Sequence, residues 1–201
     1  MSAALWMLAS YLLGATPTSY IAGRLGRGID LREHGSRNLG ATNVYRILGW
    51  AYAIPVAIID VAKGAIPVAL FGRWANGPAW LPVTLGGAAV VGHMFSPYVR
   101  FRGGKGVATA AGVFLALAPL AFAIALPVWG LCLWITGFVS LSSIVAALTF
   151  PVWVRLTAGG GPTFCASVVL ALLIVVAHRP NIKRLIAGTE NRFRARGQVP
   201  T

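Results

Sequence analysis

Long apolar stretches with few charged residues follow one another along this 201-residue chain. Only 10% of the residues are Asp, Glu, Lys or Arg, whereas a soluble domain has roughly 25%. A stretch of about 20 apolar residues can cross the hydrocarbon core of a membrane as a helix. The repetition of such stretches predicts an all-α, polytopic membrane helical bundle, and it argues against a soluble protein. We expect residues 1–201 to form a single domain.

The apolar stretches predict seven transmembrane helices, at residues 3–22, 50–71, 79–99, 107–118, 120–136, 139–156 and 163–177. As one helix, residues 107–138 would be roughly 48 Å long at 1.5 Å per residue, and the hydrocarbon core is only about 30 Å thick. Pro119 and Pro127 can each break or kink a helix, so we divide this stretch. A five-span alternative merges 107–138 and 139–177 into one helix each, but GGGP at 159–162 indicates a turn.

The basic residues indicate how these helices are oriented. Fourteen of the 17 Lys and Arg residues lie in three short segments, 24–46, 100–105 and 179–196, each next to an apolar stretch. Cytoplasmic loops are enriched in Lys and Arg, so we expect the N-terminus outside and the C-terminus in the cytoplasm. The segments lack the interleaved aromatic residues on which bases stack. The net charge of +13 therefore indicates membrane orientation, with no nucleic-acid partner.

The first polar segment contains GSRNLGATNVYRILG at 35–49. Its hydroxyl and amide side chains can bind oxygen-rich groups, and an arginine can bind a phosphate with two parallel hydrogen bonds. If 41–48 is a short helix, Thr42 and Arg46 share one face. The candidate ligands are Ser36, Asn38, Thr42, Asn43 and Arg46. The alternative is a polar loop with helix caps and arginines that hold lipid headgroups.

The second polar segment, GGKGVATAAG at 103–112, is a glycine-rich turn before a predicted helix. Backbone N–H groups at a helix start favour anions, so Gly103, Gly104 and Lys105 are candidate phosphate ligands. The alternative is a basic turn at the membrane surface. The GxxxxGK[ST] spacing of a nucleotide-binding P-loop is absent.

The third polar segment is HRPNIKRLIAGTENRF at 178–193, directly after the last apolar stretch. Histidine exchanges protons near neutral pH, which makes His178 a candidate proton acceptor, with Asn181 three residues later. The alternative is an interfacial histidine that ends the span. Glu190, one of only four acidic residues, either pairs locally or orients a basic residue of the site.

Two charged residues fall inside a predicted span. Asp60 and Lys63 are one turn apart and can pair, and because unpaired charge is costly at membrane depth, we expect a structural ion pair. His93, in the third span, is expected to pack or to support the site. The sequence has no HExxH, no clustered histidines and carboxylates, no GxSxG and no His–Asp pair separated by four residues. A catalytic metal is therefore not expected.

Together, these motifs resemble those of one bacterial family. GSRNLGATNVYRILG, GGKGVAT and HRPNIKRLIAGTENRF are similar, in order and spacing, to the three cytoplasmic motifs of the integral-membrane acyl-phosphate:glycerol-3-phosphate acyltransferases. DVAKGAIP at 60–67 and GHMFSP at 92–97 also resemble that family, and the resemblance extends over essentially the whole chain. Arg37 departs from the pattern, because the family usually has glycine there.

The resemblance implies a reaction. A fatty acyl group would move from acyl phosphate to the 1-hydroxyl of glycerol 3-phosphate, giving lysophosphatidate and inorganic phosphate in phospholipid synthesis. It implies no cofactor and no metal. The expected partners are acyl phosphate, glycerol 3-phosphate and membrane lipids. We expect a monomer in the bacterial plasma (inner) membrane, with its active site on the cytoplasmic face.

The resemblance also implies residue roles. Ser36, Arg46 and Lys105 would bind substrate phosphate, and His178 and Asn181 would lie beside the reacting hydroxyl and carbonyl groups. The implied catalytic residues are therefore His178, Asn181, Ser36 and Lys105. Either His178 or a phosphate oxygen of the donor would accept the proton. The resemblance also implies that Ser142, or its neighbour Ser143, would complete the site from the loop after residue 138.

Two other classes of protein share some of these features. A transporter for phosphorylated or anionic metabolites also has charges inside its spans, but the inverted repeat typical of many transporters is absent. A membrane phosphatase or a nucleotide-linked phosphatidyltransferase typically uses His and Asp pairs or several metal-binding acids. Four scattered acidic residues do not supply them.

Overall fold

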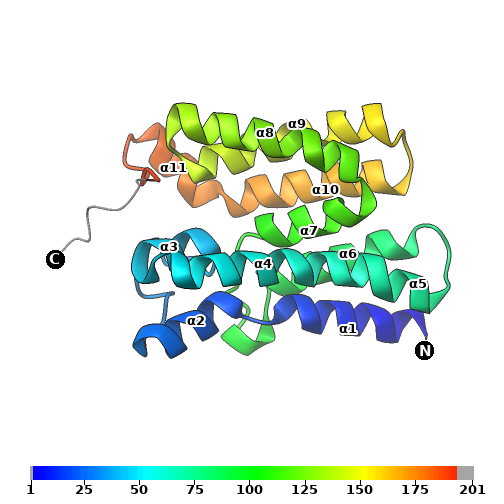
Figure 1. Ribbon diagram of the computed structural model, residues 1–201, viewed down its shortest axis with the longest axis horizontal. Coiled ribbons are helices and arrows are strands. Elements are labelled where there is room, and N and C mark those ends of the chain that lie inside the picture. The colour runs from blue at the N-terminus through cyan, green and yellow to red at the C-terminus, as the bar shows by residue number, and fades with distance from the viewer. Residues whose placement is uncertain (1, 194–201) are drawn as a thin grey trace. The chain divides into compact units, whose positions relative to one another are not determined.

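In a computed structural model, the protein is described from residue 2 to residue 193, and every regular element in this range is a helix (Figure 1). The prediction of an all-α protein is therefore confirmed. The contacts within the chain divide it into two compact units, Met1–Leu117 and Ala118–Thr201. Each unit forms its own group of packed helices.

The first unit contains α1 (Ala3–Ala15), α2 (Thr18–Arg27), α3 (Ala41–Leu48), α4 (Trp50–Ile66), the π-helix η1 (Pro67–Phe71), α5 (Gly72–Ala75), α6 (Leu81–Met94), the 3-10 turn η2 (Pro97–Val99) and α7 (Val107–Leu117). Within this unit α1 packs against α6, and α4 packs against α7. The bounds of α3 are those of the short helix predicted at 41–48.

The second unit contains α8 (Pro119–Thr136), α9 (Val139–Thr157), α10 (Pro162–Ala177) and α11 (Arg179–Ile186). α9 packs against both α8 and α10, and the three helices lie side by side (Figure 1). The predicted division of residues 107–138 is confirmed, because α7 ends at Leu117 and α8 begins at Pro119. Pro127 lies inside α8 and does not end it.

Glycines bring α1 and α6 into backbone contact. A Cβ atom added at Gly14 on α1 would meet the carbonyl oxygen of Ala89 on α6, and one added at Gly92 on α6 would meet that of Tyr11 on α1. Between membrane helices there is little hydrophobic driving force, so small residues that allow close approach are the usual contact residues. Each helix of this pair therefore contributes one glycine to the contact.

The same reciprocal arrangement joins α4 to α7. A Cβ atom at Gly64 on α4 would meet the carbonyl oxygen of Thr109, and one at Gly112 on α7 would meet that of Val61. Because the two backbones touch, the position of α7 along α4 is fixed more closely than it would be if long side chains separated the helices. This matters for the site, because the glycine-rich second polar segment leads directly into α7.

The first predicted span, 3–22, is two helices with a break between them. Pro17 has no N–H group and cannot continue the hydrogen-bonding of a helix, and the backbone leaves the helical region at Thr16 and at Pro17. The sequence predicted a distortion at Gly14 and Pro17. The structure places a complete break at Pro17, whereas Gly14 lies within α1 and contacts α6.

The described helices differ in how well they could cross a membrane on their own. Three are long and apolar enough: Trp50–Ala75, Pro119–Thr136 and Val139–Thr157. A fourth crossing is possible if Pro162–Ala177 and Arg179–Ile186, which meet at a bend of 57°, are taken together. Large apolar side chains on α8 point outward, among them Leu131 and Trp134, which are 57% and 82% exposed. Exposed apolar surface of this extent suits contact with lipid.

We predict that Gly92→Ala lowers the free energy of unfolding by about 1–3 kcal/mol, the usual cost of forcing atoms into a filled contact. Gly87→Ala on the same helix is the matched control, because a Cβ atom there meets nothing within 4 Å. Thermal unfolding in detergent measures both variants. Equal stability of the two would contradict the backbone contact between α1 and α6.

Candidate functional site

Asn43 holds the first polar segment in shape. Its side chain is 1% exposed, and its Oδ1 accepts a hydrogen bond from the backbone N–H of Ser36 at 2.8 Å. Its Nδ2 donates to the carbonyl oxygens of Leu31 and His34 at 3.2 Å and 3.1 Å. We predicted Asn43 as a substrate ligand, but its amide is occupied within the loop. The structure gives it the task of positioning Ser36.

The residues directly before and directly after Ser36 have left-handed backbone conformations. Gly35 has φ of 61°, and a Cβ atom there would press against Oδ1 of Asn43. Arg37 has φ of 57°, which costs a residue other than glycine about 1–2 kcal/mol. This conformation explains why glycine suits the position. Arg37 accommodates it at an energetic cost, and the fold of the loop is kept.

A second anchor for the same loop is the ion pair between Asp30 and Arg32. Nη2 of Arg32 lies 2.6 Å from Oδ2 of Asp30, and Nη1 donates to the carbonyl oxygen of Val99 at 2.9 Å. The hydrogen bond from Arg32 holds the pKa of the Asp30 carboxyl below its ordinary value, although burial of the carboxyl opposes this. The pair therefore ties the first polar segment to the chain just before the second. The sequence analysis did not single it out.

The second polar segment packs against the C-terminal end of α6. The N–H of Gly103 donates to the carbonyl oxygen of Met94 and that of Gly104 to the carbonyl oxygen of His93, both at 3.1 Å. A Cβ atom at Gly103 would meet the His93 carbonyl oxygen, and one at Gly104 would meet the His93 ring and the carbonyl oxygen of Leu39. Only glycine fits at both positions. Their N–H groups, which we predicted as phosphate ligands, are used within the protein.

The contact between Gly104 and Leu39 brings the first and second polar segments together in the first unit. The predicted ligands of these segments that are half-buried are Ser36, Asn38, Thr42, Arg46, Gly103, Gly104 and Lys105. Thr42 and Arg46 lie on the same face of α3, as predicted from their spacing. The contact between Gly104 and Leu39 thus joins the two segments that carry these hydroxyl, amide and cationic groups.

The α1–α2 break is held by the ion pair predicted on α4. Nζ of Lys63 lies 2.8 Å from Oδ1 of Asp60, and the two side chains are 3% and 1% exposed. Lys63 also donates to the carbonyl oxygen of Thr16 at 2.9 Å, and Asp60 accepts a hydrogen bond from Oγ1 of Thr18 at 2.6 Å. The cation lies at the C-terminal end of α1 and the anion at the N-terminal start of α2. Each charge therefore complements the helix dipole beside it.

A small pocket adjoins this break. Its polar lining includes Ser19, Lys63 and His93, and Gly103 and Gly104 border it as well. The hydroxyl of Ser19 is buried and has no hydrogen-bond partner among residues 2–193. No local pattern in the sequence predicts this pocket, because its walls come from α2, α4, α6 and the second polar segment, which are distant from one another in the chain.

In the second unit, His178 lies between α10 and α11 and is 3% exposed. Its Nδ1 lies 2.8 Å from the carbonyl oxygen of Ile174. A carbonyl oxygen only accepts, so Nδ1 bears the proton, and in the neutral ring Nε2 is the acceptor nitrogen. This is the tautomer that a proton acceptor at Nε2 requires.

Glu190 joins the third polar segment to α9. Its Oε1 accepts hydrogen bonds from Nδ2 of Asn181 at 2.6 Å and from Oγ of Ser140 at 2.8 Å, and its Oε2 accepts one from Nε of Arg184 at 2.7 Å. Burial raises the pKa of Glu190, but these three donors together lower it below its ordinary value. Of the two roles predicted for Glu190, the structure shows the local ion pair. The sequence analysis did not predict the contact with Ser140.

Ser142 and Ser143 lie within α9, not in a loop after residue 138. Their hydroxyls donate to the carbonyl oxygens of Phe138 and Val139, both at 2.9 Å, as serines inside helices commonly do. Oγ of Ser143 also accepts a hydrogen bond from Nε1 of Trp129 at 3.3 Å. Both serines are buried in the first turns of the helix, which begins directly after Phe138.

Within the described residues, no group of three or more His, Cys, Asp or Glu side chains is arranged to hold a metal ion. The carboxylates of Asp30 and Glu190 in the three polar segments are paired with arginines, and these segments also carry hydroxyl, amide, guanidinium, ammonium and imidazole groups. Such groups bind and orient anionic, oxygen-rich ligands.

The chain is similar to known proteins over nearly its whole length. Residues 4–188 match the family described as glycerol-3-phosphate acyltransferase. A glycerol-3-phosphate acyltransferase of Trichlorobacter lovleyi is 45% identical over 191 residues, covering 94% of this chain and 97% of the relative. That of Syntrophotalea carbinolica is 42% identical over 190 residues, covering 94% and 96%.

Two solved structures are similar to the chain as well. One is a crystal structure of PlsY (YgiH), an integral membrane glycerol 3-phosphate acyltransferase, in its glycerol 3-phosphate form. It is 38% identical, with a TM-score of 0.89 and 95% of both chains covered. The other is the lysophosphatidic acid form, 36% identical, with a TM-score of 0.86 and 94% of both chains covered.

Arg37→Gly is expected to raise the free energy of unfolding by about 0.5–1 kcal/mol. Glycine removes the left-handed strain, and part of this gain is offset because glycine gives the unfolded chain more freedom. Arg37→Ala is the matched control, since it removes the same charge but keeps the Cβ atom. Thermal unfolding in detergent compares the two variants, and an equal gain in both would show that charge rather than conformation is responsible.

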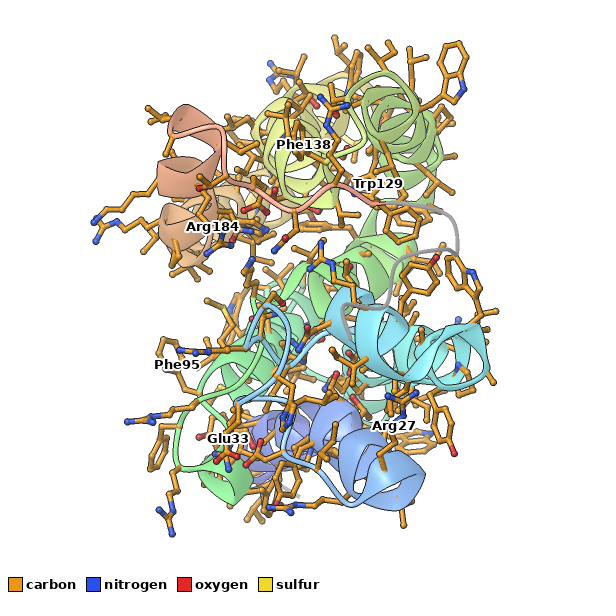
Figure 2. The ribbon with its side chains drawn as sticks, turned by 90° about the vertical axis from the view of Figure 1, so that its left-hand side faces the viewer. Arg27, Glu33, Phe95, Trp129, Phe138 and Arg184 are labelled. Carbon is orange, nitrogen blue, oxygen red and sulfur yellow. The ribbon has the colours of Figure 1, made fainter. Side chains whose placement is uncertain are left out.

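Glu190→Gln is expected to lower stability at pH 7 and to make little difference at low pH. The pKa of Glu190 is lower in the folded protein than in the unfolded chain, so its contribution is complete above the ordinary value of 4.5 and is lost as the pH falls through the folded value. Unfolding midpoints of wild type and variant, measured from pH 7 down to pH 3, should converge. The control is Glu33→Gln, at an exposed carboxylate (Figure 2). A constant difference between wild type and Glu190→Gln would contradict the prediction.

Proposed function

The chain belongs to the glycerol-3-phosphate acyltransferase family, and on this premise we propose that it transfers a fatty acyl group from acyl phosphate to the 1-hydroxyl of sn-glycerol 3-phosphate. The products are lysophosphatidate and inorganic phosphate. The observation that most supports this proposal is the contact between Gly104 and the carbonyl oxygen of Leu39. It joins two polar segments, rich in groups that bind phosphate, within an apolar helical unit. One substrate of the reaction is water-soluble, and the other has an acyl tail.

Three side chains of the first unit are proposed to bind substrate phosphate. Arg46 can donate two parallel hydrogen bonds to phosphate oxygens, and Lys105 adds a second positive charge. Ser36 supplies a hydroxyl at a position fixed by Asn43. Because the N–H groups of Gly103 and Gly104 are used within the protein, the anion is bound by side chains together with amides at the start of α7.

The remaining predicted ligands are proposed to assist binding and orientation. Asn38 and Thr42 offer further hydrogen bonds near Ser36 and Arg46. In the second unit Ser142 and Ser143 offer hydroxyl oxygens as acceptors, since their protons are donated to the helix backbone. Glu190 acts indirectly by holding Asn181 in place.

The chemical step is a displacement at the acyl carbonyl carbon. A bond forms between this carbon and the 1-hydroxyl oxygen of glycerol 3-phosphate, and the bond between the carbon and the phosphate oxygen breaks. The hydroxyl proton passes to Nε2 of His178 or to an oxygen of the departing phosphate. Asn181 orients the reacting groups by hydrogen bonding. Acyl phosphate is already activated, so positioning and charge stabilisation supply most of the rate enhancement.

We also propose seven membrane spans in the bacterial inner membrane, with the N-terminus outside and the three polar segments in the cytoplasm. The positive-inside distribution of Lys and Arg supports this orientation. α7 has 11 residues and is roughly 16 Å long at 1.5 Å per residue, so it crosses about half of the hydrocarbon core. The glycine contacts with α4 hold it in place within the first unit.

The purified protein, given palmitoyl phosphate and glycerol 3-phosphate, is expected to release phosphate and lysophosphatidate in equal amounts, with or without EDTA. Lys105→Ala is expected to lower kcat/KM by at least about 100-fold, since it removes a charge that binds phosphate. Lys183→Ala is the matched control, because Lys183 is exposed on α11.

Two further outcomes decide between the mechanisms. Phosphate release without lysophosphatidate would indicate hydrolysis, and neither product from folded protein would contradict the proposed reaction. His178→Gln is expected to lower kcat by about 100-fold or more if Nε2 accepts the proton. A smaller loss, with an unchanged pH profile, assigns the proton to the donor phosphate.

A further inference from the structure

His93 lies between the buried ion pair and the glycine-rich turn. Its Nδ1 is 3.9 Å from Oδ1 of Asp60, and its ring is what a Cβ atom at Gly104 would meet. Its own carbonyl oxygen accepts the N–H of Gly104. The ring of His93 therefore lies beside the Asp60–Lys63 pair. Both its ring and its backbone contact the glycine-rich turn.

The His93 ring is held by its surroundings rather than by a hydrogen bond. The distance of 3.9 Å between its Nδ1 and Oδ1 of Asp60 is too long for a hydrogen bond. The side chain is 8% exposed and borders the pocket that Ser19, Lys63 and Gly104 also line. The ring thus fills the space between α4 and the turn, and its position determines how close the turn can approach.

The glycine-rich turn is held in position by several contacts. Gly103 and Gly104 both donate to α6 carbonyl oxygens, and Gly104 also touches the carbonyl oxygen of Leu39. Lys105 follows directly, and α7 begins two residues later. A displacement of the His93 ring therefore moves the Lys105 backbone relative to the first polar segment.

We propose that His93 is a positioning residue: held beside the Asp60–Lys63 pair, it sets the place of Gly104 and thereby of the Lys105 ammonium group. It does not touch the substrate. The inference rests on the proposed function, in which Lys105 binds a substrate phosphate. It also gives the ion pair at the α1–α2 break a role in binding substrate, in addition to its role in the fold.

The test compares His93→Gln with Lys105→Arg in steady-state kinetics on both substrates. Misplacing a binding group by about 1 Å can cost on the order of 100-fold, so we expect at least a tenfold rise in KM. The substrate whose KM rises in His93→Gln should be the one whose KM rises in Lys105→Arg, while kcat changes by less than about threefold. Arg73→Gln is the control, because Arg73 is exposed on α5, outside the three polar segments.

The double variant separates positioning from a general loss of structure. If His93 acts through Lys105, His93→Gln should raise KM much less in a Lys105→Arg background than in wild type. Equal fold-changes in the two backgrounds, a change in kcat alone, or no change in either parameter would overturn the proposal. Gly104→Ala, which displaces the turn from the other side, should give the same substrate-selective rise in KM, and it serves as the second variant if His93→Gln does not fold.

Failure of this inference can be told apart from failure of the proposed function. If wild type forms lysophosphatidate and the His93 variant keeps its KM values, only the inference is wrong. If wild type forms no product, the proposed function is wrong, and the same variants are compared by calorimetry with glycerol 3-phosphate as the probe. A Kd unchanged by His93→Gln, or no binding by wild type, would then overturn the inference too.

Discussion

The first unit depends on hydrogen-bond partners for the backbone groups at the point where a helix stops in apolar surroundings. A helix end leaves backbone groups without partners, and lipid offers none. Here Lys63 binds the carbonyl oxygen of Thr16 and Asp60 binds the hydroxyl of Thr18, so one ion pair supports both ends of the break. Two charges that would be costly alone at this depth are thus paired with each other, and Lys63 also binds a backbone carbonyl oxygen while Asp60 accepts a hydrogen bond from a side-chain hydroxyl. The break in turn leaves room for the pocket beside His93.

The polar segments are held by side chains that bind backbone groups. Asn43 binds three backbone groups of the first segment, and Arg32 reaches from that segment to the carbonyl oxygen of Val99. In the second unit Glu190 plays the corresponding part through Asn181 and Ser140. A reaction that relies on positioning needs such support, because a binding group on a mobile loop loses most of its advantage. Part of the polar content of these segments therefore anchors their backbone, and the rest includes the proposed ligands.

The close glycine contacts explain how short helices can support a membrane enzyme. α7 is too short to cross the hydrocarbon core, yet Gly64 and Gly112 seat it against α4 with backbone touching backbone. Membrane helices gain their association from such packing. The glycine-rich turn before α7 is thereby tied to a fixed helix at one end and to His93 at the other. The proposed binding of phosphate near Lys105 depends on this double support of the turn.

Local patterns in the sequence determined the all-α class, the division at Pro119, the bounds of α3 and the pairing of Asp60 with Lys63. Each depends on residues a few positions apart, where helix geometry and the cost of buried charge leave one solution. The ordered motifs also determined the family. Only the tertiary structure decided that Asn43 anchors a loop, that Ser142 bonds to its own helix, that Ser140 meets Glu190 and that His93 meets Gly104. Asn43, Ser140 and His93 contact residues that are separated from them in sequence, and the packing of the chain selects these partners, which no local pattern records. For Ser142 several hydrogen-bond partners were open, and the structure shows the one in its own helix.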